Sequence, residues 1–255
     1  MFNWQTPLTA SWSDRVKGSW WKALVIIALY FIARSIAEFK AIAMGLRASG
    51  VKITPENLNQ LVTNQEKVMV YLTKVEWFYH GQVALLCLGL VILMMLFKLK
   101  VFDFRQLSWR GVGYTVLVFM FFYILQILYG LYLEHFVPEF KEPENQMLIV
   151  GMFKHMTPIF LYLTIAIFTP ITEELIFRAL MMKYTFSLMP VVGALVSSIL
   201  FALVHGPADV YQFFTYYLLA AGITWVFWRT RRIEYAILFH ILQNSLSFIG
   251  ILASM

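Results

Sequence analysis

Long apolar runs separated by short polar segments dominate the chain. A helix needs about 20 largely apolar residues to cross a bilayer. Seven runs approach or exceed that length: 20–46, 78–97, 111–133, 157–182, 188–205, 210–228 and 233–253. Pro170 removes a helical hydrogen bond inside the fourth run, which is therefore either one kinked crossing or two shorter pieces. We expect one kinked helix, and the pattern predicts an all-α transmembrane bundle of about seven to eight spans.

Residues 55–75 follow a different pattern. Thr54 can cap a helix, and Pro55 suits its first position. Apolar residues then recur at helical spacing with polar residues between them. This pattern predicts an amphipathic helix on the outer surface. It either caps the bundle or screens substrate access, and the capping role is favoured.

The composition agrees with a membrane protein. Of 255 residues, 60% are hydrophobic and 13% are charged, against about 25% charged in soluble domains, and the mean hydropathy is +0.71. We expect a single membrane domain over 1–255. Cys87 is the only cysteine, which excludes an intramolecular disulfide and a cysteine zinc cage.

The basic residues predict an orientation. Positive charge gathers in cytoplasmic loops of membrane proteins, so the net charge of +6 does not indicate a nucleic-acid partner. Basic clusters precede the first span and lie in alternate loops, which predicts a cytoplasmic N-terminus and an external C-terminus after seven crossings. These residues are Arg15, Lys17, Lys22, Lys98, Lys100, Arg105, Arg110, Lys183, Arg229, Arg231 and Arg232.

Two adjacent carboxylates lie in the fourth apolar run. Each costs roughly 2.5–3.5 kcal/mol at bilayer depth on insertion scales, so a function is expected. Glu174 and Arg178 are four residues apart and can pair on one helix face as a structural brace. Glu173 points about 100° away and is predicted to be the free carboxylate, suited to a general base or acid. Arg34 and Glu38 in the first run have the same spacing and are also expected to form a structural brace.

Two histidines and an asparagine lie in later apolar runs. His205 ends the fifth run and, taken alone, is more typical of an interfacial histidine. His240 and Asn244 share a face of the last run, where hydrogen bonding between helices is the plainer interpretation of the pair.

Together, Glu173, His205, His240 and Asn244 permit two chemistries for hydrolysis of a carbonyl compound, most naturally a peptide bond. In one, Glu173, His205 and His240 hold a Zn²⁺ with an open position for water. In the other, Glu173 and His205 activate a water directly while His240 and Asn244 stabilise the oxyanion.

These residues resemble the motifs of the CPBP intramembrane proteases, which include the CAAX prenyl endopeptidases and bacterial bacteriocin-processing or immunity proteins of the Abi type. The family's EExxxR motif is similar to Glu173, Glu174 and Arg178. Its FxxxH and HxxxN motifs are similar to Phe201–His205 and His240–Asn244. The three motifs occur in order and cover roughly residues 165–250.

The resemblance implies an all-helical intramembrane endopeptidase. In the roles it implies, Glu173 and His205 activate water and His240 and Asn244 stabilise the oxyanion. Family members are described both as metalloproteases and as metal-free enzymes, and we favour the metal-free mechanism. The small size resembles bacterial members, which implies the bacterial cell membrane and a substrate that is a small membrane-associated peptide or protein, such as a bacteriocin precursor, peptide pheromone or leader peptide.

Two further hypotheses stay open. The chain could be a non-catalytic bacteriocin-immunity or signalling membrane protein in which the polar residues are structural. It could also be a transporter with a carboxylate proton relay, although no pairing of interrupted helices in the two halves supports that.

Overall fold

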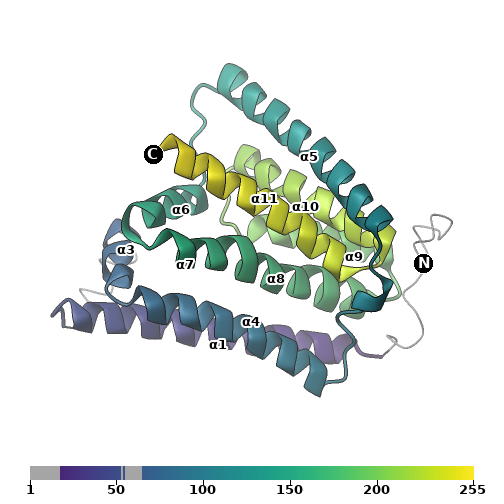
Figure 1. Cartoon of the computed structure of the whole chain (residues 1–255), viewed down its shortest axis with the longest axis horizontal. Helices are drawn as coiled ribbons and strands as arrows, with labels where there is room; N and C mark the ends of the chain where they lie inside the picture. The colour runs from purple at the N-terminus through teal and green to yellow at the C-terminus, as the bar shows by residue number, and fades with distance from the viewer. Residues whose placement is uncertain (1–17, 53, 55–64) are drawn as a thin grey trace.

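The computed structural model describes residues 18–52, 54 and 65–255, and all regular elements in these ranges are helical (Figure 1). The longer helices are α1 (Trp20–Ala48), α3 (Gln65–Thr73), α4 (Glu76–Leu96), α5 (Trp109–Phe136), α6 (Glu144–His155), α9 (Pro190–Leu203), α10 (Val210–Thr230) and α11 (Ile233–Ser254). The remaining elements are η2 (Phe104–Gln106) and the consecutive segments α7 (Pro158–Tyr162), η3 (Leu163–Phe168), α8 (Thr169–Glu174) and η4 (Leu175–Thr185). The predicted all-α class is confirmed.

The run from α7 to η4 lies in the middle of the bundle. Figure 1 shows α1 and α4 on one side of it and α5, α10 and α11 on the other. Leu175, Leu180 and Met182 of η4 are fully buried. By contrast, α5 exposes about half of its apolar side chains and buries few of them fully, as expected of a helix that faces lipid. The segment with the two glutamates is therefore enclosed by the other helices.

Within the described residues, five helices are long and apolar enough to cross a membrane: α4, the run Pro158–Thr185, α5, α10 and α11. The predicted span 188–205 corresponds to α9, which has only 14 residues, and the predicted span 20–46 corresponds to α1, which is not among the five. The chain is thus an integral membrane protein, but the predicted count of seven to eight spans is not confirmed.

The region around Pro170 is one uninterrupted helical run rather than two pieces. Proline lacks an N–H group and its ring clashes with a carbonyl one turn earlier. Here the π-helical segment η3 precedes Pro170, and a wider turn of this kind is a common device at functional sites. A second π-helical segment, η4, begins directly after Glu174.

The predicted helix over 55–75 is described only in part, because 55–64 lie outside the described residues. Within α3, Met69 and Leu72 are buried. A Cβ atom built on Gly45 of α1 would lie 2.4 Å from the backbone oxygen of Tyr71, so the two backbones approach closely. This part of the segment therefore packs against the bundle, and its capping role stays a prediction.

The basic segments meet at one end of the bundle. Lys183 Nζ donates a hydrogen bond to the Lys100 carbonyl oxygen at 2.9 Å, and Arg232 Nη1 donates to the Asp103 carbonyl oxygen at 3.3 Å. Lys22 Nζ lies 3.4 Å from a carbonyl oxygen just after α4. This arrangement is consistent with the predicted alternation of loops, while the cytoplasmic location of this end remains a prediction.

Candidate active site

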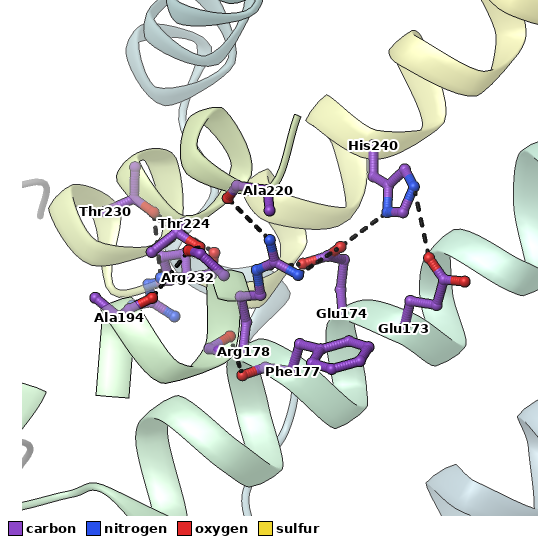
Figure 2. Close-up of polar contacts among 12 residues, drawn as sticks. Glu173, Glu174, Phe177, Arg178, Ala194, Ala220, Thr224, Thr230, Arg232 and His240 are labelled. Carbon is purple, nitrogen blue, oxygen red and sulfur yellow. Dashed lines mark hydrogen bonds and ion pairs between the residues drawn. The ribbon is translucent and has the colours of Figure 1, made fainter. Parts of the chain in front are cut away.

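The predicted brace between Glu174 and Arg178 is present. Arg178 Nε lies 3.1 Å from Glu174 Oε2, and neither side chain is exposed to solvent. Arg178 Nη2 also donates a hydrogen bond to the Ala220 carbonyl oxygen of α10 at 3.0 Å (Figure 2). The guanidinium further lies over the Phe201 ring, 4.7 Å from its centroid. The buried arginine is therefore held by a carboxylate, a carbonyl group and an aromatic face.

His240 lies between the two glutamates. Its Nδ1 atom is 2.8 Å from Glu174 Oε1, and its Nε2 atom is 3.8 Å from Glu173 Oε2 (Figure 2). The imidazole is nearly buried at 2% exposure, whereas Glu173 keeps 19%. Glu174 therefore does more than pair with Arg178, because it also contacts the His240 ring at the nitrogen that faces away from Glu173.

The contact with Glu174 fixes the orientation of the His240 ring. A carboxylate paired with arginine is a hydrogen-bond acceptor, so we assign the Nδ1 proton as the one donated to Glu174. This leaves Nε2 towards Glu173. In the neutral ring Nε2 accepts a hydrogen bond, and in the doubly protonated ring it donates one.

His205 follows the end of α9 and is half-buried. Its Nδ1 atom is 2.7 Å from the Phe201 carbonyl oxygen, so Nδ1 carries the proton and Nε2 is free to accept. The ring stacks on Tyr216 at 4.4 Å between centroids and lies 4.7 Å from Phe201. Tyr216 was not predicted as a site residue, because nothing in the sequence relates α10 to the end of α9.

Phe201 separates the two imidazoles. Its fully buried ring lies 5.6 Å from the ring of His240, with His205 as its other imidazole neighbour. Among the described residues, no direct contact joins His205 to Glu173. The predicted pair therefore does not touch, although both side chains line the same cavity.

Asn244 interacts with the π-helical segment. Its Nδ2 atom donates a hydrogen bond to the Ile165 carbonyl oxygen of η3 at 2.9 Å. A side-chain amide carries two N–H donors, so one remains for another acceptor. Gln243, which directly precedes Asn244, exchanges hydrogen bonds of 3.0 and 3.3 Å with Gln126 of α5. The Gln243–Gln126 pair was not predicted, because an uncharged glutamine in an apolar run such as 111–133 does not by itself indicate a partner on another helix.

A cavity of about 650 Å³ joins these side chains. Glu173, His205, His240 and Asn244 all line it, so the structure brings the four predicted residues to one space. Its remaining lining is largely apolar, with further polar residues from several helices, and includes Ile42, Leu72, Met152, Phe248, Tyr30, Arg34, Glu38, Gln126 and Gln243. Such a space suits an apolar segment of chain held near a few polar groups.

The predicted zinc ligands Glu173, His205 and His240 do not lie close enough together to bind one metal ion in this arrangement. In the described part of the chain, no three His, Cys, Asp or Glu side chains gather closely enough to hold a metal ion. Glu173 and His240 approach each other, but His205 is held by Phe201 and Tyr216. Zinc binding stays a prediction, and the mechanism below uses no metal.

Comparison with known proteins adds one finding. Residues 155–246 match the family model of the type II CAAX prenyl endopeptidase Rce1-like proteins. The matched segment contains all three motifs, so the resemblance to the CPBP/CAAX protease family is confirmed over this range. No curated protein and no solved structure matches the chain.

Proposed function

We propose that this membrane protein, whose residues 155–246 match the type II CAAX prenyl endopeptidase family, is an intramembrane endopeptidase that cleaves a small membrane-associated peptide or protein. One observation carries the proposal. Glu173 and His240 lie 3.8 Å apart on the wall of the cavity, and His240 is anchored from behind by the buried Glu174–Arg178 pair. A carboxylate and an oriented imidazole at one cavity are the parts that general acid–base hydrolysis requires.

In the proposed reaction, Glu173 takes a proton from a water molecule in the cavity. The resulting hydroxide attacks the carbonyl carbon of the peptide bond and forms a tetrahedral intermediate. The free Nε2 atom of His205 can accept the second hydrogen of the same water and so orient it. Glu173 then passes its proton to the amide nitrogen, the C–N bond breaks, and an amine and a carboxylic acid are released.

The oxyanion of the intermediate needs hydrogen-bond donors. Asn244 has one N–H group left after its bond to Ile165, and His240 can donate from Nε2 when its ring carries both protons. Removing one such donor typically slows an enzyme by about 10²- to 10³-fold. The anchoring of both side chains would keep these donors in place during the reaction.

The proposal is tested by comparing the peptide termini produced in membranes that contain the wild type or Glu173→Gln. We expect new termini in the wild type that are missing from Glu173→Gln, because glutamine cannot accept the proton. Glu139→Gln is the matched control, since Glu139 is exposed and does not line the cavity. Identical sets of termini in all three membranes, at equal protein levels, would favour a non-catalytic role.

A further inference from the structure

Arg34 and Glu38 place charge in the middle of a long helix. Arg34 lies midway along α1, about 21 Å from either end at 1.5 Å per residue. The Arg34 Nε atom is 2.7 Å from Glu38 Oε1, which confirms the predicted pair. An ionisable pair in the middle of a largely apolar helix of a membrane protein is a candidate functional site.

This pair differs from the buried brace. Glu174 and Arg178 have no exposed surface, whereas the side chains of Arg34 and Glu38 are 50% and 52% exposed. Both residues line the cavity that contains Glu173. At this exposure the ion pair adds little to the stability of the fold, because solvent-exposed pairs contribute at most about 1 kcal/mol. Stabilising the fold is therefore a weak reason for the pair.

The guanidinium of Arg34 has donors to spare. It offers five N–H groups, and the pair with Glu38 uses Nε. Among the described residues, neither of its Nη atoms has a hydrogen-bond partner. Two adjacent N–H groups of this kind match the two oxygens of a carboxylate in a bidentate arrangement.

The cavity around Arg34 indicates what carries that carboxylate. Apolar side chains from α1, α3, α6 and α11 line it, among them Ile42, Leu72, Met152 and Phe248. A ligand that fills this space is therefore apolar along most of its length and anionic at one point. A free phosphate or a small hydrophilic acid would leave these apolar walls unfilled.

We propose that Arg34 is a specificity-determining residue that binds a carboxylate of an apolar peptide substrate, and that Glu38 holds the guanidinium in position. The carboxylate is either the C-terminus of the peptide or an acidic side chain. This inference rests on the proposed function, since it assigns the substrate of the same cavity.

Binding of labelled peptides to the protein in nanodiscs tests the inference without relying on cleavage. Three apolar peptides of one sequence are compared: one with a free C-terminal carboxylate, one with a C-terminal amide, and one with the amide and a final aspartate. We expect the free carboxylate, the aspartate form or both to bind the wild type about tenfold or more tightly than the neutral amide, as for hydrogen bonds to charged groups. Which of the two anionic forms binds identifies the source of the carboxylate.

Three variants test whether the preference for an anionic peptide depends on Arg34. Arg34→Gln should lose the preference for the anionic peptide, while Arg47→Gln, an exposed site on the same helix outside the cavity, should keep it. Glu38→Gln should keep or strengthen the preference, because the glutamine oxygen can still accept the hydrogen bond from Arg34 Nε while the competing negative charge is removed. Opposite effects at Arg34 and Glu38 cannot come from general damage to α1.

Equal wild-type affinity for the three peptides, or a preference that survives Arg34→Gln, would overturn the inference. Anion-selective binding that depends on Arg34 would support it even if no peptide were cut. In that case the endopeptidase proposal alone would fail, so the two failures are distinguishable.

Discussion

The surroundings of His240 decide what this site can do. Glu174 contacts one ring nitrogen at 2.8 Å, and Glu173 lies 3.8 Å from the other. From the sequence, Glu174 was expected to be a brace and Glu173 a free carboxylate, whereas in the structure both lie next to one imidazole. At the residue scale, Arg178 neutralises Glu174 and Glu174 orients His240, so three buried or nearly buried side chains support one partly exposed carboxylate.

The buried pair is expected to show strong coupling in stability. Arg178→Met leaves the carboxylate of Glu174 buried without its cation, which should cost about 3–5 kcal/mol. The double variant Glu174→Gln/Arg178→Met should be less destabilised than that single variant, because no unpaired charge remains in the core. Thermal unfolding in detergent of the double variant and of the two single variants, Glu174→Gln and Arg178→Met, measures the coupling. A loss in the double variant equal to the sum of the two single losses would show that the charges are not coupled.

The local contacts of the site could be predicted from the sequence, but the long-range contacts could not. Glu174–Arg178 and Arg34–Glu38 follow from spacing along one helix, and both pairs are present. The contact from His240 to Glu174 joins residues 66 positions apart. Helical periodicity says which face a residue occupies but not which helix that face meets, so this contact could not be predicted. The catalytic roles of Glu173, His205, His240 and Asn244 stay predictions.

At the scale of elements, close helix approach holds α10 against its neighbours. A Cβ atom built on Gly222 would lie 2.7 Å from Phe239 Cζ of α11 and 2.8 Å from Phe122 Cγ of α5. Small residues commonly allow such approaches between helices in membranes. Since α11 carries His240, this packing also positions the candidate site.

We therefore expect Gly222→Ala to destabilise the protein by about 1–3 kcal/mol through overpacking. Gly130→Ala is the matched control, because a Cβ atom there meets nothing within 4 Å and alanine favours a helix. Melting temperatures of the two variants in the same detergent measure the difference. A Gly222→Ala protein as stable as the control would mean that α10 is less tightly packed than described.

Most helices were predictable because their apolar runs are long. The π-helical segments η3 and η4 were not, since no residue pattern in the sequence specifies a turn of that width. The shortness of α9 was also missed. Its apolar run continues to residue 205, but a turn at Val204–His205 ends the helix before Gly206, which adopts a positive φ of 67°.

At the scale of the whole molecule, Asp103 links the loop after α4 to the start of α11. Its side chain lies 2.8 Å from Lys100 Nζ and 3.6 Å from Arg232 Nη1, and its backbone N–H donates to Glu234. The hydrogen bond from Lys100, together with the charges of Lys100 and Arg232, lowers the pKa of the Asp103 carboxyl below its usual value.

A lowered pKa in the folded state stabilises the protein above the unfolded pKa of about 4, and this stabilisation is lost as the pH falls through the folded value. The melting temperature of the wild type should therefore drop on acidification below about pH 4 more than that of Asp103→Asn. Parallel pH profiles for the two proteins would show that Asp103 does not contribute.

The alternation of basic loops was predictable from charge alone, and the structure gathers these loops at one end. The cavity was not predictable, because it is the space left among α1, α3, α4, α6 and the later helices rather than a property of any one of them. This is why Arg34 and Glu38 were expected to form only a brace.

Cleavage of peptides by purified protein in liposomes is the decisive test of the proposed endopeptidase activity. Wild type and Glu173→Gln would each be given membrane-associated apolar peptides, with and without a chelator. We expect cleavage by the wild type that persists in chelator and is abolished in Glu173→Gln. Cleavage of the same bond at an undiminished rate by Glu173→Gln would contradict it, because the water-activating carboxylate would then lie elsewhere.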